Sequence, residues 1–246
     1  MIATIQKNNS YKIDLSKPLD ISLPLQAGPE NVNAWWAPHP RIEPVVMGSF
    51  IGDVNQGGSV NFINIFLNPH GNGTHTECVG HISTEPYTIQ CLKQFVFVAL
   101  LISVTPIETN TGDTVIFKEQ LPDLFDSDVD AVIIRTLPNN DSKKLKQYSG
   151  TNFTYVDAAL MQHLADNNIS HFLIDLPSVD REEDGGALAA HHAFWQYPHQ
   201  VRKHATITEF IFVDNAITDG TYILNLQITS LQNDASPSKP VLYALL

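Results

Sequence analysis

Short apolar runs and alternating apolar and polar positions dominate the chain, and this pattern is typical of β-strands. Residues 94–104 are almost entirely apolar and rich in β-branched and aromatic side chains. That composition predicts a strand covered on both faces, with a helix as the competing interpretation at this length. Residues 131–136 predict a second buried strand, and residues 11–15 and 59–67 predict two shorter strands.

One segment has the periodicity of an amphipathic helix. Within residues 155–168, apolar side chains recur at spacings of three and four, and Asp157 near the start is a candidate N-cap. The segment continues into residues 169–177, where a further strand is expected. A strand, a helix and a strand in this order predict a crossover unit with parallel strands, and ligands gather at the carboxyl ends of such strands.

Residues 24–44 contain five prolines and the pair Trp35 and Trp36. Proline lacks the amide donor, so this stretch predicts a long loop, and such loops are frequently functional. One tryptophan is a candidate wall of an aromatic substrate pocket; the alternative is that both cover the core or a subunit contact. Residues 220–246 predict two more strands joined by a turn. The pattern as a whole favours a β-rich fold with few helices.

With 246 residues, 43% of them apolar, the chain is long enough for one sizeable domain or two small ones. The formal net charge of −12 argues against nucleic acid or an anionic membrane as a partner, because few cations are present to neutralise phosphates. The two cysteines give no disulfide framework and are interpreted as the reduced thiols of a cytoplasmic protein. We find no signal peptide and no membrane-length apolar run.

Residues 68–82 hold His70, His75, Glu77 and His81 in a glycine-rich loop. His75 and Glu77 are two residues apart, so in an extended chain they point to the same side. Imidazole and carboxylate on one face form a ligand set for a divalent metal, and His70 can fold back across the glycine turn to the same ion. His81 is placed to carry a proton beside Glu77. The competing interpretation is a polar surface loop without a function.

This segment resembles the cyclase family, which includes bacterial kynurenine formamidases and isatin hydrolases and carries the motif H-x-G-T-H-x-D-x-P-x-H. Residues 73–77 match its G-T-H-x-D core, and His81 matches its last histidine. Three departures are present. Glu77 replaces the aspartate, a valine replaces the proline, and His70 stands five residues before His75 where the family has a spacing of four.

The resemblance recurs along the chain. Residues 14–19 resemble the family's D-L-S-x-P-L opening, and residues 175–180 resemble its D-T-P-S-x-D segment. Residues 190–195 resemble its A-H-H-A-L-L helix, and residues 207–211 resemble its I-L-E-N-L segment. Residues 234–237 resemble its D-A-S-P ending. In the family a histidine of that helix and the glutamate complete the metal site. By match these are His191, with His192 as the second choice, and Glu209. The competing interpretation is that His191 and His192 lie at an exposed helix start and that Glu209 points outward from its strand. If the Glu209 side chain points inward it needs a cation beside it, because burying a lone carboxylate costs roughly several kcal/mol.

The resemblance implies an α/β fold of the cyclase-like swivelling β/β/α type, with residues 1–246 in a single domain around a β-rich, barrel-like core. It also implies a metal-dependent, arylformamidase-like hydrolase that cleaves an amide-type C–N bond in a small aryl or cyclic substrate. One or two divalent ions, zinc or manganese, would generate a metal-bound hydroxide, with His81 as the proton carrier. The expected metal ligands are His70, His75, Glu77, His191 and Glu209.

Two alternatives stay open. The three departures from the motif favour a metal-free relative that binds a small molecule, and a metal-dependent lyase or cyclase is also compatible, because a fold does not determine a reaction. Trp35, Trp36 and His192 are the candidates for contact with a small-molecule substrate. The resemblance further implies a homodimer or homotetramer.

Overall fold

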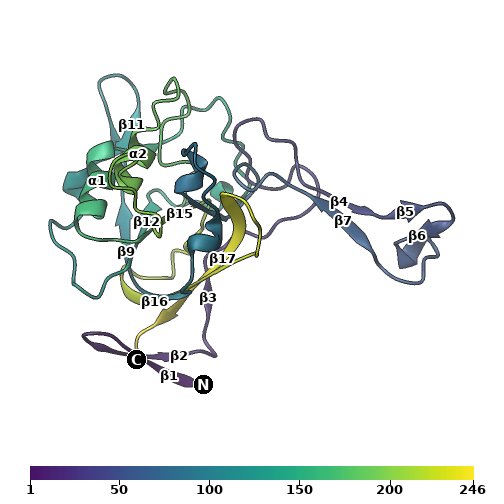
Figure 1. Ribbon diagram of the computed structural model, residues 1–246, viewed down its shortest axis with the longest axis horizontal. Coiled ribbons are helices and arrows are strands. Elements are labelled where there is room, and N and C mark those ends of the chain that lie inside the picture. The colour runs from purple at the N-terminus through teal and green to yellow at the C-terminus, as the bar shows by residue number, and fades with distance from the viewer.

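Seven strands close on themselves into a mixed β-barrel in this computed structural model, which describes all 246 residues (Figure 1). Their order is β16-β9-β12-β14-β15-β8-β17, and β17 pairs back with β16 to complete the ring. The short β3 (Leu19–Asp20) pairs with β17 outside the ring. The ring strands are β8 (His75–Cys78), β9 (Val96–Val104), β12 (Ala131–Thr136), β14 (His171–Ile174), β15 (Thr206–Glu209), β16 (Gly220–Ile228) and β17 (Ala235–Ala244).

Four neighbouring strands, β9, β12, β14 and β15, run parallel to one another, and the other ring pairings are antiparallel. The expected crossover is confirmed: α1 (Ala158–Asp166) lies in the chain between β12 and β14, which pair in parallel. The carboxyl ends of the four parallel strands therefore meet at one end of the barrel.

Side chains of the barrel wall alternate between two apolar clusters. Ile133 and Leu173 belong to the cluster that fills the barrel, which draws its members from β9, β12, β14, β16 and β17. Ile134 and Phe172, one position away, belong to the cluster that packs outside the wall against α1 and α2 (Ala189–Trp195). Ile207 of β15 also belongs to this outer cluster, so its side of β15 faces the helices.

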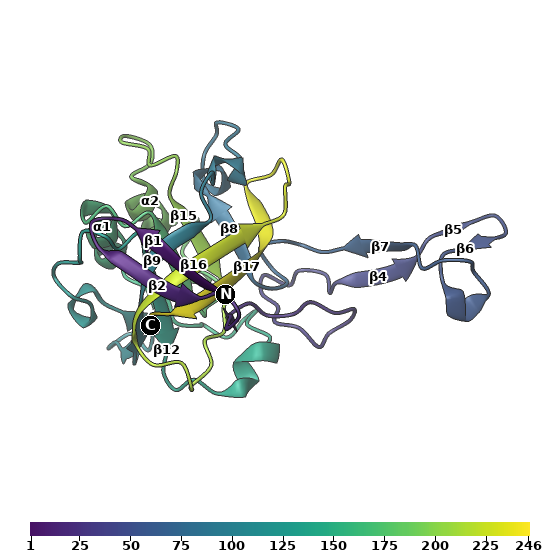
Figure 2. The same ribbon diagram turned by 90° about the horizontal axis from the view of Figure 1, so that it is seen from below.

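The remaining strands form small sheets outside the ring. β1 (Ile2–Gln6) pairs with β2 (Ser10–Asp14), and β10 (Ile107–Glu108), β11 (Thr114–Ile116) and β13 (Tyr155–Val156) form a three-stranded sheet. A long arm projects from the barrel, built from β4 (Arg41–Pro44) with β7 (Ile63–Phe66) and β5 (Val46–Met47) with β6 (Phe50–Ile51) (Figure 2). Short 3-10 helices occupy Val54–Gln56, Val79–His81, Ile89–Cys91, Lys118–Gln120 and Asp141–Leu145.

The expected fold class, an α/β domain with a barrel-like β core and few helices, is confirmed. Two elements differ from expectation. The strand expected over residues 59–67 is only β7, and it lies in the arm rather than in the barrel. The expected helix begins at Ala158, because Tyr155–Val156 pairs with β11, and the Asp157 side chain makes no capping hydrogen bond. No helix has the length and apolarity needed to cross a membrane.

Candidate metal centre

Two facing strands form the base of the site. β8 is extended as the spacing of His75 and Glu77 predicts, and it pairs with β15 so that His75 lies opposite Glu209 and Glu77 opposite Ile207. His75 Nε2 is 3.3 Å from Glu209 Oε2, and both side chains are buried. Since Ile207 faces the helices, the His75, Glu77 and Glu209 side chains lie between the barrel wall and α2.

The His75 ring is oriented by its own loop. Its Nδ1 lies 2.9 Å from the Gly73 carbonyl oxygen. A carbonyl only accepts hydrogen bonds, so Nδ1 carries the proton and Nε2 of the neutral ring presents a lone pair to the site. This is the tautomer that a metal-binding histidine needs when it uses Nε2.

The displaced His70 reaches the same site. Its Nδ1 is 3.1 Å from Glu77 Oε2, and its Nε2 is 2.9 Å from Asp234 Oδ2. At the next position, a Cβ added to Gly71 would lie 2.5 Å from Ala37 Cβ, so the loop has no room for a side chain there. The histidine is therefore supplied from one position earlier than in the family motif.

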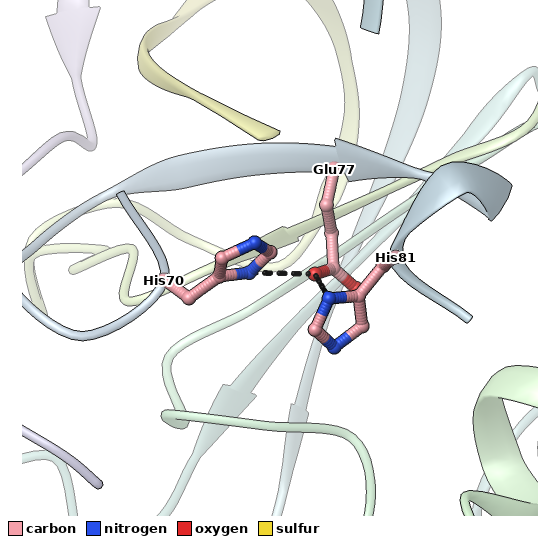
Figure 3. Close-up of side chains that lie close together, drawn as sticks. All are labelled: His70, Glu77 and His81. Carbon is pink, nitrogen blue, oxygen red and sulfur yellow. Dashed lines mark ion pairs between the residues drawn. The ribbon is translucent and has the colours of Figure 1, made fainter. Parts of the chain in front are cut away.

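Glu77 lies at the centre of the group. Its Oε2 is 3.7 Å from His81 Nδ1, and its Oε1 is 3.0 Å from His191 Nε2. Figure 3 shows the Glu77 carboxylate between the His70 and His81 rings, with the second ring nitrogen of His81 turned away from it. The early loop, α2 and β15 thus converge on one buried carboxylate.

Two further carboxylates hold these imidazoles, and sequence reasoning did not select them. Asp180 Oδ2 is 2.6 Å from His191 Nδ1, and the same side chain accepts the Ala190 and His191 backbone N–H groups. Asp234 contacts His70 and lies 3.5 Å from His81 Nδ1. Each aspartate stands in a segment that resembles the family, which is the signal that could have identified them.

The carboxylates set the ionisation of the imidazoles. Burial lowers the pKa of His191, but hydrogen bonds with Asp180 and Glu77 and their negative charges outweigh it and raise that pKa to about 10. Burial also lowers the pKa of His70, but the contacts with Asp234 and Glu77 outweigh it and raise that pKa to about 10. Although burial raises the pKa of Glu77, the surrounding histidines hold it well below its ordinary value. The site is strongly attractive to positive charge.

Two buried atoms indicate that a divalent metal fits between these side chains. His75 Nε2 and Glu77 Oε2 have no hydrogen-bond partner, although His70 Nδ1 lies near Glu77 Oε2 without the required alignment. Unsatisfied buried polar atoms are costly, so these two atoms suit a site that binds a cation. His75, Glu77 and Glu209 form one set of candidate ligands, and His70, Glu77 and His81 form a second set that shares Glu77. Tetrahedral ligands about 2.0–2.2 Å from an ion lie roughly 3.4 Å apart, close to the observed spacings.

The family model of the putative cyclases matches residues 13–181, which is more than half of the chain. The chain belongs to the putative cyclase family. No curated protein sequence matches it.

Solved structures with this cyclase fold cover nearly the whole chain. A potential metal-dependent hydrolase with cyclase activity superimposes with a TM-score of 0.65 at 18% identity, covering 92% of this chain and 97% of its own. A predicted metal-dependent hydrolase from Bacillus stearothermophilus gives a TM-score of 0.60 at 19% identity, covering 92% and 98%. An isatin hydrolase bound to the product analogue thioisatinate gives 0.67 at 12% identity, covering 94% of each chain.

In this cyclase-family chain, a cavity of about 310 Å³ opens above the centre and is lined by His70, His81, His191 and Glu209. Of the candidate substrate contacts, only Trp35 lines it. Trp36 is 71% exposed and its backbone N–H donates to the Ser149 hydroxyl. His192 faces away, with Nδ1 3.0 Å from the Tyr197 carbonyl oxygen. The structure thus brings the five expected ligands and His81 together and leaves Trp36 and His192 apart.

Proposed function

We propose that this chain is a metal-dependent hydrolase that cleaves an amide-type C–N bond in a small aryl or cyclic substrate. The observation that carries the proposal is the pair of unpartnered buried atoms, His75 Nε2 and Glu77 Oε2, in a three-residue ligand set at the base of a cavity. The metal-dependent hydrolases and the isatin hydrolase that share the fold support it.

The residues that would hold the ion differ in chemistry. His75, Glu77 and Glu209 supply one nitrogen and carboxylate oxygens, while His70 contacts Oε2 and His191 contacts Oε1 of Glu77. Mixed nitrogen and oxygen ligands suit zinc or manganese, as one or two ions. A bound divalent ion lowers the pKa of water toward neutrality and polarises a carbonyl oxygen. Asp180 orients His191, and the carbonyl of Gly73 orients His75.

His81 is the residue placed to move the proton. It lines the cavity, its side chain is 30% exposed, and its Nδ1 faces the carboxylates of Glu77 and Asp234. The other ring nitrogen is then free to take a proton from the attacking water and deliver it to the leaving nitrogen of the substrate. Trp35 at the cavity edge provides an aromatic wall for the substrate ring.

The test is the variant His81→Ala, assayed on N-formyl aryl amines and isatin with metal content measured in parallel. General acid–base catalysis contributes roughly 10²–10⁴-fold, so kcat should fall by that factor while the ion held by the set without His81, that of His75, Glu77 and Glu209, is retained. His192→Ala removes an imidazole outside the cavity and should leave kcat unchanged. Full turnover by His81→Ala would contradict the proton-carrier role. A wild-type protein without zinc or manganese, even after soaking, would instead favour a metal-free binding protein.

A further inference from the structure

The two cysteines of the chain lie side by side at the end of the barrel opposite the metal centre. β8 begins at His75, one of the candidate ligands, and ends at Cys78. Cys91 is the last residue of the 3-10 helix Ile89–Cys91, which packs against β8. The two thiol side chains are hydrogen-bonded to each other, and neither is in a disulfide. Two thiols on packed neighbouring elements are the arrangement from which a disulfide within one chain forms.

One backbone segment holds the strand and the helix together. The Cys78 N–H donates to the Asp234 carbonyl oxygen over 3.0 Å, and the Ile89 N–H donates to the Asn233 carbonyl oxygen over 2.8 Å. Because the two acceptors are consecutive residues, β8 and the helix cannot separate without breaking one of these hydrogen bonds. The thiols therefore remain neighbours in the folded chain.

The two thiols differ in their access to small molecules. Cys78 is 0% exposed. Cys91 is half-buried and lines a cavity of about 280 Å³, together with Lys93 and His171. A small reagent in this cavity reaches the Cys91 sulfur directly, and it reaches Cys78 only past Cys91.

The surroundings of Cys91 favour its reactive form. The hydrogen bond from Cys78 lowers the pKa of Cys91, burial opposes this shift, and the Cys91 and Leu92 backbone N–H groups and the charge of Lys93 lower the pKa further. The thiolate is the nucleophile in cysteine chemistry, so the accessible sulfur is also the activated one. The formal net charge of −12 repels anionic oxidants but does not oppose a neutral hydroperoxide.

We propose that Cys91 and Cys78 form a reversible oxidation site for small hydroperoxides, in which Cys91 reacts first and Cys78 completes a disulfide. The Cys91 sulfur attacks the O–O bond and takes one oxygen as a sulfenic acid, and the other oxygen leaves with the thiol proton as water or an alcohol. The Cys78 sulfur then attacks the Cys91 sulfur, the S–S bond forms, and the sulfenic hydroxyl leaves with the Cys78 proton as water. The peroxide gains the two electrons that the thiols lose, and an external dithiol reverses the reaction.

The disulfide would close residues 78–91 into a ring that contains His81, so oxidation would restrain the segment that carries the proposed proton carrier. The oxidation site itself is independent of the proposed hydrolase activity, because it is tested by the state of the two sulfurs and not by turnover.

Counting thiols tests the proposal, because the chain contains two cysteines and no more. The protein is treated with hydrogen peroxide, denatured, labelled with N-ethylmaleimide and measured by intact mass spectrometry. Untreated protein should take up two labels. Treated protein should take up none, lose the mass of two hydrogen atoms, and run as a single chain on a non-reducing gel. Dithiothreitol should restore both labels.

Two matched variants separate the roles of the thiols, and circular dichroism confirms that each is folded. Cys78→Ser should lose its remaining thiol at the wild-type rate, but as a sulfenic acid that dimedone traps. Cys91→Ser retains only the buried thiol, which should react at least roughly tenfold more slowly.

Wild-type protein that keeps both labels in peroxide, or that ends as a sulfinic acid or a disulfide between two chains, overturns the proposal. Equal oxidation rates for Cys91→Ser and Cys78→Ser also overturn it, because Cys91 is then not the thiol that reacts first.

Discussion

Replacing Glu77 with Gln removes the carboxylate shared by both ligand sets while preserving its size. In the metal-free protein Glu77 is completely buried and balances the charges of His70 and His191. Breaking a buried ion pair by removing one partner costs about 3–5 kcal/mol. In a domain of this length each kcal/mol corresponds to about 2–4 °C in the melting temperature, so metal-free Glu77→Gln should melt about 6–20 °C below the wild type.

The decisive assay compares melting curves in chelator with curves in excess zinc or manganese. An ion at 100 times its dissociation constant stabilises the folded state by about 2.7 kcal/mol, which raises the melting temperature by roughly 5–10 °C. Glu77→Gln should lose this rise. Asp128→Asn is the control, because Asp128 is an equally buried carboxylate that binds the backbone N–H groups of Asn8 and Asn9 far from the centre. A wild-type metal response in Glu77→Gln would refute the placement of the ion.

Two further perturbations address the loop and the opposite end of the barrel. Gly71→Ala should lower metal affinity and stability by about 1–3 kcal/mol, because the added Cβ would meet the rigid Ala37 side chain. Gly73→Ala should lower them less, since its added Cβ meets the mobile end of the Leu25 side chain. Burial lowers the pKa of His171 to about 3, so the unfolded chain binds an extra proton below pH 6.5 and stability falls by up to about 1.4 kcal/mol per pH unit toward pH 3. The variant His171→Phe can stack on Phe97 as the imidazole does. Its free energy of unfolding, measured in urea at pH 7 and pH 5, should lose this dependence on pH. A pH dependence equal to that of the wild type would contradict the prediction.

Local patterns were enough to predict the parts of the centre that lie within one segment. The two-residue spacing of His75 and Glu77 predicts a shared face, and β8 provides it. The helical spacing that follows Asp157 predicts α1, and the order of strand, helix and strand predicts the parallel pairing of β12 and β14. These features depend on backbone geometry over a few residues, which the sequence displays directly.

Long-range packing determines the parts that sequence reasoning missed. Asp234 reaches His70 only because β17, which follows it, pairs with β8. Sequence reasoning also did not connect Lys143 with Asp175, although the Lys143 Nζ lies 2.9 Å from that buried carboxylate. The strand pattern over residues 59–67 does not reveal whether the strand joins the barrel, because alternating apolar positions look the same in a projecting ribbon and in a barrel strand.

The metal centre and the closure of the barrel depend on the same register. β8 is the strand that joins β15 to β17, so the ring is closed where His75 faces Glu209. Between the two candidate ligands, Thr76 points into the barrel, where its hydroxyl lies 2.8 Å from the hydroxyl of buried Thr208. A slip of one residue would turn His75 and Glu77 into the apolar interior and break this pair. The polar contact inside the wall thus favours the pairing that presents the imidazole and both glutamates to the same space beneath α2.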